Sequence, residues 1–418
     1  MGSDESKPTV SVFAEGEQPG PFSIRRCPGY EKGICQNPPE LQTMQDMILE
    51  SFKKFANNPY IGYRERNGEK LSNKFTFKTY KECETIAYQF GSGLISLGVQ
   101  PKDLVGVYSG NCPEWLHMID VSSLYGHVIA ALYDTFGQEI MGKLIKNSEL
   151  ETILVSMKNA PKLLDILKAD KFKVQRVIVF TDSNNSYEEL KEGFQSCQIN
   201  FYTFNDILDI GKNDIKPLPK LDEDCIYYIC FSSGTTGMPK GVMISNRSQV
   251  SNTINVRKQL HFTSQSRHLS YLPLPHVFER AAVSAIMHVG GCVGVFSGSI
   301  QKLIEDMQIL KPTFLPAVPR VINRIYDNVM NKVHSSSYIK QGIFWGSWYW
   351  KRFWLKRGSN SPFTDRIIFD AINKQLGGEI SFFIICGAAS NPWIHEFIGF
   401  ATGSQIAVGY GLSDEGLK

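Results

Sequence analysis

The sequence predicts an α/β protein in which parallel sheets are layered with helices. Short apolar runs of the kind found in buried strands recur along the chain, and segments with helical periodicity alternate with them. Of the 418 residues, 42% are hydrophobic and 20% are charged, which excludes a disordered or collagen-like protein. The length indicates roughly two to four domains or one large enzyme body.

The expected elements follow one another in a regular order. Residues 1–45, rich in Pro, Gly and charge, are expected to form an extended arm. Residues 79–98 have helical periodicity up to Gly98, and 113–132 are expected to form a helix and then a strand. The polar segment 184–224 is expected to be a loop region between two subdomains. Buried strands are expected at 105–111, 151–156, 176–180, 226–231 and 381–387.

Composition excludes several classes of function. The chain has 44 Lys and Arg against 41 Asp and Glu, a net charge of +3, which gives no reason to expect a nucleic-acid partner. Nine Cys form no CxxC pair and eight His lack metal-ligand spacing, so reduced thiols are expected. The N-terminus has no signal-peptide segment and no apolar run approaches the roughly 20 residues of a membrane span. These features favour a cytoplasmic protein.

Two features suggest contact with a membrane surface, such as the cytosolic face of the endoplasmic reticulum. The N-terminus fits the myristoylation pattern, with Gly2 as the acceptor and Ser6 at the required offset. Four of the six Trp lie in GIFWGSWYWKRFWLKRG (342–358), where aromatic and basic residues interleave. Trp345 and Trp348 are candidates for lipid contact. The alternative is a buried helix, because the aromatics spread around the helical wheel.

A segment rich in glycine and hydroxyl residues, SSGTTGMPKGVMISN (232–246), directly follows the expected strand 226–231. Small residues let backbone N–H groups approach an anion, hydroxyls donate further hydrogen bonds, and Lys240 supplies positive charge. A Walker A loop would have Ser or Thr after its Lys, where Gly241 stands here. The segment therefore predicts a hairpin that binds pyrophosphate or triphosphate. Its candidate ligands are Ser232, Ser233, Gly234, Thr235, Thr236, Gly237 and Lys240.

The segment FSSGTTGMPKGV (231–242) resembles the signature of the adenylate-forming, AMP-binding superfamily. YLPLPHVFER (271–280) and KPTFLPAVPRVINRIYD (311–327) resemble segments of its long-chain fatty acyl-CoA synthetases. ICGAAS (385–390) resembles the adenine-binding strand end, and GYGLSDEG (409–416) resembles the Tyr-Gly-x-Thr-Glu motif. The resemblance covers about residues 45–418.

This resemblance implies the N-terminal domain of an adenylate-forming enzyme, with two parallel-sheet α/β subdomains and a small β subdomain. The subdomains are expected at 46–220 and 221–418. The family's C-terminal hinge and small domain are expected to be missing, because the chain stops at Lys418. Two interpretations of the chain stay open: it is a fragment of a full ligase, or it is a natural truncation.

The resemblance also implies ATP-dependent conversion of a long-chain fatty acid to acyl-AMP, from which coenzyme A takes the acyl group. Lys240, His276 and Ser413 are the implied catalytic residues, and Ser413 stands where the family has Thr. The implied nucleotide site adds Gly387, Ala388, Ala389, Gly409, Tyr410 and Gly411 to the phosphate-binding segment. The implied acyl pocket is formed by His276, Phe314, Pro316 and Val318.

The sequence departs from the family pattern near the implied metal site. Ser413 is followed by Asp414 and Glu415, and either carboxylate suits Mg²⁺. Ser390 replaces a Pro after the adenine strand, and Ser245 and Asn246 replace Thr and His. An alternative function is a catalytically silent protein that binds ATP and fatty acid. A Walker-type ATPase is a third reading, which the missing Ser or Thr after Lys240 disfavours.

Overall fold

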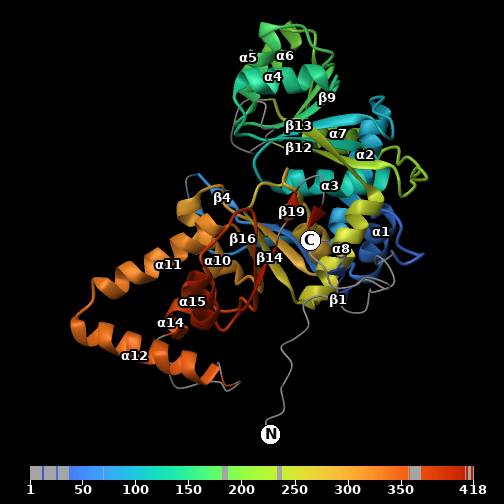
Figure 1. The fold of residues 1–418 in the computed structure, drawn as a ribbon. Coiled ribbons are helices and arrows are strands. Elements are labelled where there is room, and N and C mark those ends of the chain that lie inside the picture. Colours follow the sequence, from blue (N-terminus) through green and yellow to red (C-terminus); the bar gives the residue numbers. More distant parts are fainter. Residues whose placement is uncertain are drawn as a thin grey trace.

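The computed structural model describes two seven-stranded sheets, with helices between them and on their outer faces (Figure 1). This is the α/β class that the sequence predicts. The described residues are 12–13, 25–26, 37–68, 70–180, 187–232, 238–355, 357, 369–409, 411–412 and 416–417. Within them, the strands outside the two sheets form three two-stranded pairs, and the expected small β subdomain stays a prediction.

The first sheet has the strand order β11-β10-β9-β7-β8-β12-β13. Its strands pair in parallel except for β12 and β13, which form an antiparallel hairpin at one edge. The strands are β7 (Leu104–Tyr108), β8 (Val128–Leu132), β9 (Thr152–Ser156), β10 (Arg176–Phe180), β11 (Asn200–Thr203), β12 (Ile226–Ser232) and β13 (Lys240–Ser245).

The second sheet has the order β18-β17-β16-β14-β15-β3-β6 and is parallel except for the pair β3–β6. Two of its strands precede the first sheet in the chain, whereas the other five follow it. The strands are β3 (Pro59–Tyr63), β6 (Thr76–Thr79), β14 (Arg267–Ser270), β15 (Cys292–Val295), β16 (Phe314–Ala317), β17 (Phe382–Ile385) and β18 (Gln405–Val408).

The boundary expected at residue 220 therefore does not separate the strands of the two sheets. β3 and β6 join the second sheet, and β12 and β13 join the first. An isolated strand signal does not say which sheet a strand joins, because that choice depends on long-range packing.

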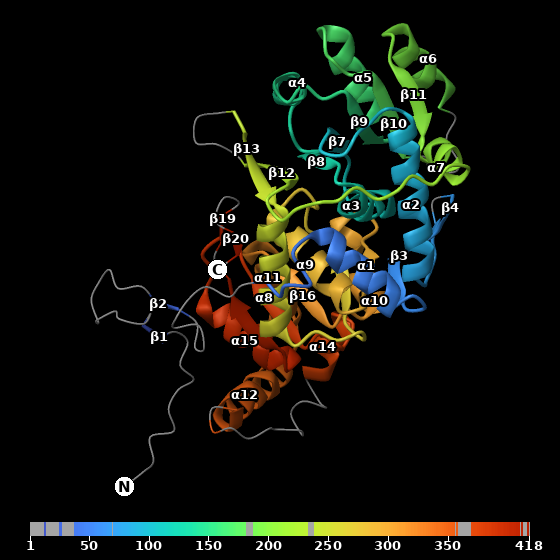
Figure 2. The ribbon, with the colours of Figure 1, turned by 90° about the vertical axis from the view of Figure 1, so that its right-hand side faces the viewer.

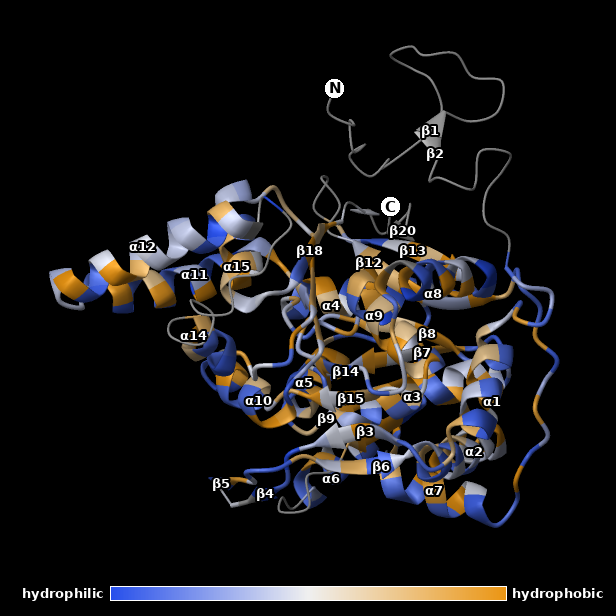
Figure 3. Cartoon of the chain, turned by 90° about the horizontal axis from the view of Figure 1, so that it is seen from below, coloured by the Kyte–Doolittle hydropathy of each residue, from blue (hydrophilic) through white to orange (hydrophobic). Residues whose placement is uncertain are grey.

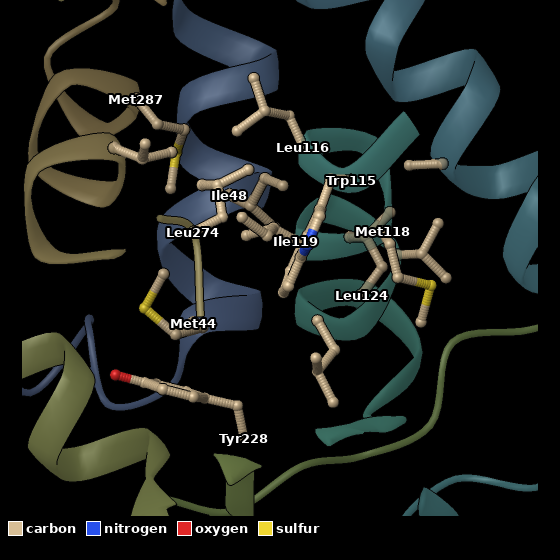
Figure 4. Packing of buried hydrophobic residues seen from close by; sticks show 14 of the residues in the cluster. Met44, Ile48, Trp115, Leu116, Met118, Ile119, Leu124, Tyr228, Leu274 and Met287 are labelled. Atoms are coloured by element: carbon tan, nitrogen blue, oxygen red, sulfur yellow. The ribbon is translucent and has the colours of Figure 1, made fainter. Parts of the chain in front are cut away.

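Side chains of several strands alternate between a central and an outer core. In β10, Ile178 and Phe180 belong to the central core, whereas Val177 and Val179 belong to the outer one. The central core also contains residues of both sheets. Figure 4 shows part of it, where Tyr228 of the first sheet lies near Met44, Ile119 and Met287 of the central helices. The helices of the central core are α1 (Met44–Lys54), α2 (Tyr80–Ser96), α3 (Pro113–Tyr125), α7 (Phe204–Lys212), α8 (Asn246–Leu260) and α9 (Val277–His288).

The outer helices cover the far faces of the sheets (Figures 1 and 2). The first sheet is covered by α4 (Gln138–Asn147), α5 (Ala160–Ala169) and α6 (Glu188–Ser196). The second sheet is covered by α10 (Leu303–Leu310), α11 (Pro319–His334), α14 (Asp370–Gln375) and α15 (Pro392–Thr402). α12 (Tyr338–Leu355) packs against these helices and extends beyond them. The short pairs are β1 (Val12–Phe13) with β2 (Arg25–Arg26), β4 (Arg66–Asn67) with β5 (Lys70–Leu71), and β19 (Gly411–Leu412) with β20 (Gly416–Leu417).

Local signals explain where the central helices begin and end. A capping box between Thr79 and Glu82 starts α2, and Gly98 follows its end with φ +87°. Pro113 starts α3, and Gly126 ends it in the left-handed region at φ 72°. α3 is buried on all sides from Trp115 to its end, as expected for a helix in the central core.

The expectation of loops over 184–224 is wrong for much of that segment. It contains α6, β11 and α7. α7 starts with a capping box between Thr203 and Asp206, and it buries Phe204 and Ile207. Its polar residues lie on the solvent face of a short amphipathic helix, so the composition resembled that of a loop.

Candidate active site

The predicted phosphate-binding segment begins at the end of β12 and continues into β13, and these two strands pair as an antiparallel hairpin. Ser232 lies opposite Lys240 in the register, so strand pairing fixes both ends of the turn. Lys240 is exposed at the start of β13. The predicted ligands Ser233, Gly234, Thr235, Thr236 and Gly237 lie outside the described residues. The hairpin is thus confirmed, whereas the phosphate contacts remain a prediction.

The ends of three parallel strands meet at one edge of the second sheet. Ala317 of β16 pairs with Ile385 of β17, which pairs with Val408 of β18. The N–H of Cys386 donates to the carbonyl of Ala317 at 3.0 Å, and that of Gly409 donates to Ile385 at 2.9 Å. Ligands of open α/β sheets bind beyond the carboxyl ends of the strands, which makes this edge a candidate nucleotide site.

Two glycines at this edge have a physical reason to be glycine. Gly387 has φ +98°, a conformation that L side chains rarely adopt. At Gly409, an added Cβ would lie 2.3 Å from the Sγ of Cys386. The predicted residues Gly387, Ala388, Ala389 and Gly409 therefore lie together at neighbouring strand ends.

The rest of the last motif is only partly described. Gly411 lies in β19, and Figures 1 and 2 both show β19 below the β12–β13 hairpin. The predicted Tyr410, Ser413, Asp414 and Glu415 lie outside the described residues. The roles assigned to them remain predictions.

The segment YLPLPHVFER connects β14 to α9 and lies against the same edge. Leu272 and Phe278 form a small apolar cluster with Cys386, and Val318 packs against it. The hydroxyl of Tyr271 donates to the carbonyl of Pro316 at 2.7 Å. Three of the motifs on which the resemblance rests therefore meet in space, although they are far apart in the sequence.

His276 is the N-cap of α9, two residues before Phe278 of this cluster, and the residue is exposed. Its Nδ1 accepts a hydrogen bond from the backbone N–H of Phe278 at 3.1 Å. Partial loss of water lowers the pKa of the imidazole, an effect that the carboxylate of Glu279 opposes. The ring is therefore neutral at pH 7, and because Nδ1 accepts, Nε2 carries the proton. His276 thus presents a hydrogen-bond donor, not a positive charge.

Asn111 is a positioning residue that the sequence did not single out. It follows β7 in the first sheet, and its Nδ2 donates to the carbonyl of Leu272 at 2.7 Å. Its Oδ1 accepts from the N–H of Leu274 at 3.1 Å. Both amide atoms therefore hold the loop that leads to His276. A lone Asn before a helix has no distinguishing pattern, so only the contact itself reveals this role.

A buried pair of a histidine and a glutamate joins the two elements on either side of the same loop. The Nε2 of His268 in β14 and the Oε1 of Glu279 in α9 are 2.8 Å apart, and both side chains are fully buried. The neighbouring Arg280 is also buried, with its guanidinium 4.5 Å from the ring centre of Tyr228 in the first sheet. These contacts fix α9, and with it His276, relative to both sheets.

The predicted acyl-pocket residues are in different environments. Val318 is half-buried at the strand edge near Gly387. Pro316 is buried in β16 and accepts the hydrogen bond from Tyr271. Phe314 is at the opposite end of β16, where it packs against Phe262 and His268. This position favours a packing role for Phe314, and the acyl pocket remains a prediction.

No metal site is formed by the part of the chain that the structure describes, in which no group of three or more His, Cys, Asp and Glu could hold an ion. The two carboxylates proposed for Mg²⁺ lie outside that part.

These observations define an α/β protein with a candidate nucleotide site, formed by a glycine- and hydroxyl-rich hairpin and the carboxyl edge of a parallel sheet. A family model described as AMP-binding enzyme matches residues 63–416. The chain therefore belongs to the AMP-binding enzyme family.

Individual relatives agree with this assignment. Long chain acyl-CoA synthetase 5 of Arabidopsis thaliana is 31% identical over 386 residues, which are 90% of this chain and 57% of the relative. Fatty acyl-CoA synthetase A of Dictyostelium discoideum is 30% identical over 419 residues, or 97% of this chain and 60% of the relative. The chain spans about three fifths of the length of these curated relatives.

A solved structure supports the fold. The adenylation domain of a carboxylate reductase from Mycobacterium chelonae superposes with a TM-score of 0.77 at 18% identity. The match covers 91% of this chain and 59% of the reductase chain.

Proposed function

We propose that this chain is a catalytic part of a long-chain fatty acid–CoA ligase. Its reaction would join a long-chain fatty acid to ATP, giving acyl-AMP and pyrophosphate, before coenzyme A takes the acyl group. One observation carries the proposal: the segments 271–280, 316–318 and 385–389 and Gly409 meet at one sheet edge. The curated relatives are named as long-chain acyl-CoA synthetases, which supports the substrate class.

The described residues suggest how the site would work. A carboxylate attacks phosphorus among several negative charges, so catalysis is mainly positioning and charge neutralisation. Lys240 would neutralise charge on the phosphates, beside the backbone and hydroxyl donors of the hairpin turn. Neutral His276 would donate a hydrogen bond near the reacting carboxylate. Asn111 would hold the loop that carries it.

Mg²⁺ fits the proposed chemistry. Asp414 and Glu415 offer the carboxylate oxygens that this ion prefers, and either could bind it. When bound, the ion would neutralise phosphate charge.

The test is ATP–pyrophosphate exchange by the chain, measured with palmitate and with acetate in the presence of Mg²⁺. Exchange that depends on palmitate is the expected result. Faster exchange with acetate would contradict the long-chain assignment. Saturable ATP binding without exchange with either acid, even when the family's C-terminal domain is supplied in trans, would instead support the silent ATP- and fatty-acid-binding protein.

A further inference from the structure

Helix α12 is apolar on two opposite sides, but only one of them is buried. Phe344 and Trp348 pack against the body, where Trp348 lies 5.0 Å from the ring centre of Phe397 and is fully buried. The opposite side is exposed, including Trp350 at 55% and Phe353 at 48%. The spread of aromatics around the helical wheel therefore reflects two apolar faces with different surroundings.

The exposed residues form one continuous stripe. Ile339, Ile343, Trp350 and Phe353 are three to seven positions apart, with Gly346 between them, which places them along one side of the helix. α12 extends from the end of the molecule away from the first sheet, and apolar segments recur along it (Figures 1 and 3). Within the described part of the chain this stripe is not covered, because each of its apolar side chains is about half exposed or more.

The charge around the stripe has one sign. No Asp or Glu occurs between Asp327 and Asp365, whereas six Lys and Arg do. Lys351 is buried and Arg352 binds Glu396 at 3.0 Å. The remaining described cations, Lys332, Lys340 and Arg357, are exposed. On the adjoining α14, Asp370 pairs with Lys374 at 3.4 Å, so its charge is balanced there.

An apolar hollow lies beside the stripe, between α11, α12 and α14. Its volume is about 480 Å³, and its lining includes Val333, Ile343 and Ile372 together with Lys332 and Lys340. Two cations beside apolar walls suit an anionic headgroup whose acyl chain reaches the hollow.

From this combination we infer that the exposed face of α12 docks on an anionic membrane surface. Amphipathic aromatics enter the headgroup layer, and lysines beside them are attracted to anionic lipids. Within the described part of the chain, no helix has the length and apolar character needed to cross a bilayer. α12 would therefore lie in the plane of the interface. This face differs from the sequence expectation, since Trp348 is buried and Trp350 and Phe353 are exposed.

Vesicle flotation of the 418-residue chain tests the inference, using phosphatidylcholine alone or with about 30 mol% phosphatidylserine. We expect flotation with the anionic vesicles that weakens as salt is raised. Trp350→Ser/Phe353→Ser should lower the partition coefficient at least about tenfold, because two interfacial aromatics are lost. The matched control is Ile215→Ser, since Ile215 is 50% exposed and lies outside α12.

Charge-reversal variants distinguish electrostatic attraction to anionic lipid from non-specific hydrophobic adsorption. Lys332→Glu/Lys340→Glu should reduce flotation with anionic vesicles at least about tenfold. Lys158→Glu/Lys162→Glu makes the same change in net charge near α5, where both lysines are exposed, and should float like wild type. Circular dichroism checks that each variant folds. If the aromatic variant misfolds, quenching of wild-type Trp fluorescence by brominated lipid provides the second readout.

Three outcomes would overturn the inference: no flotation of wild type, equal flotation of wild type and the aromatic variant, or no quenching by brominated lipid. A dimer that the aromatic variant converts to monomer, with vesicle binding unchanged, would show that a second copy covers the face. The assay contains neither ATP nor fatty acid. Its result is therefore independent of the proposed ligase activity.

Discussion

Asn111 lies in the loop after β7 of the first sheet, and Leu272 lies in the loop after β14 of the second sheet. The side chain of Asn111 donates a hydrogen bond to the carbonyl of Leu272 at 2.7 Å. The same side chain accepts from Leu274, so one residue satisfies two backbone groups of the other half. Because His276 follows directly, the position of its ring depends on a contact between the two sheets.

Replacing Asn111 should therefore impair the site more than the fold. For Asn111→Ala we expect a loss of about 1–3 kcal/mol in the free energy of unfolding, since two backbone groups lose their partner. Palmitate-dependent exchange should fall at least about tenfold, because His276 is no longer held in place. Asn111→Asp keeps the acceptor for Leu274 but not the donor for Leu272, and should be intermediate. Unchanged exchange in Asn111→Ala would show that the loop keeps its position without this contact.

Because two histidines are buried, we expect the free energy of unfolding to fall as the pH is lowered. His127 is fully buried, and its Nδ1 donates to the carbonyl of Gln100 at 3.1 Å. Its buried Nε2 has no partner among the described residues, so a proton there would be costly. Burial lowers the pKa of His127 to about 4 and that of His117 to about 3, from 6.5.

Proton binding decides the direction in which stability changes with pH. Below pH 6.5 the unfolded chain takes up protons that folded His127 and His117 do not, so stability falls as the pH is lowered towards 4. Between pH 7 and pH 5 each histidine should remove about 2 kcal/mol from the free energy of unfolding. His127→Asn keeps a donor near Gln100 and should show a smaller fall over this range. His334→Asn, at an exposed position, should follow wild type. Urea unfolding at several pH values measures the difference, and parallel curves for His127→Asn and wild type would contradict the assignment.

Short-range signals in the sequence predicted much of this fold. The apolar run before Ser232 is a buried strand, and the strands on either side of the glycine- and hydroxyl-rich segment pair as a hairpin. Gly98 follows a helix end, as its position indicated. Each of these signals depends on neighbouring residues only, which is why one sequence was sufficient.

Long-range pairing could not be predicted in this way. Nothing local to Pro59–Tyr63 indicates that β3 joins a sheet whose other parallel strands begin at Arg267. The aromatic run was also ambiguous, because a helix with two apolar faces does not show which one the body covers. For Asn111, the partner is Leu272, 161 positions later in the chain.

The close contact between Gly409 and Cys386 provides a test of the strand edge. An added methyl at Gly409 would lie 2.3 Å from the Cys386 sulfur, so one of the two must move. Gly409→Ala should cost about 1–3 kcal/mol in the free energy of unfolding through overpacking. Cys386→Ala removes the sulfur, and the double variant should be less destabilised than the sum of the single ones. Strict additivity in urea unfolding would show that the two residues do not compete for this space.

Substitution of Lys240 tests whether the β12–β13 hairpin neutralises phosphate charge, as the nucleotide proposal requires. Its Cα lies opposite Ser232, at the point where β12 and β13 lead into the turn. Lys240→Ala should slow palmitate-dependent exchange about a hundredfold or more, because one charge that neutralises phosphate is lost. Lys240→Arg keeps the charge and should retain more activity, whereas Lys212→Ala, at an exposed position on α7, should behave as wild type. In a form of the enzyme that makes the thioester, transfer from supplied acyl-AMP should survive the loss of Lys240, since the phosphates it neutralises have already left. Equal loss in both half-reactions would mean that Lys240 supports the fold of the hairpin and has no specific role in adenylation.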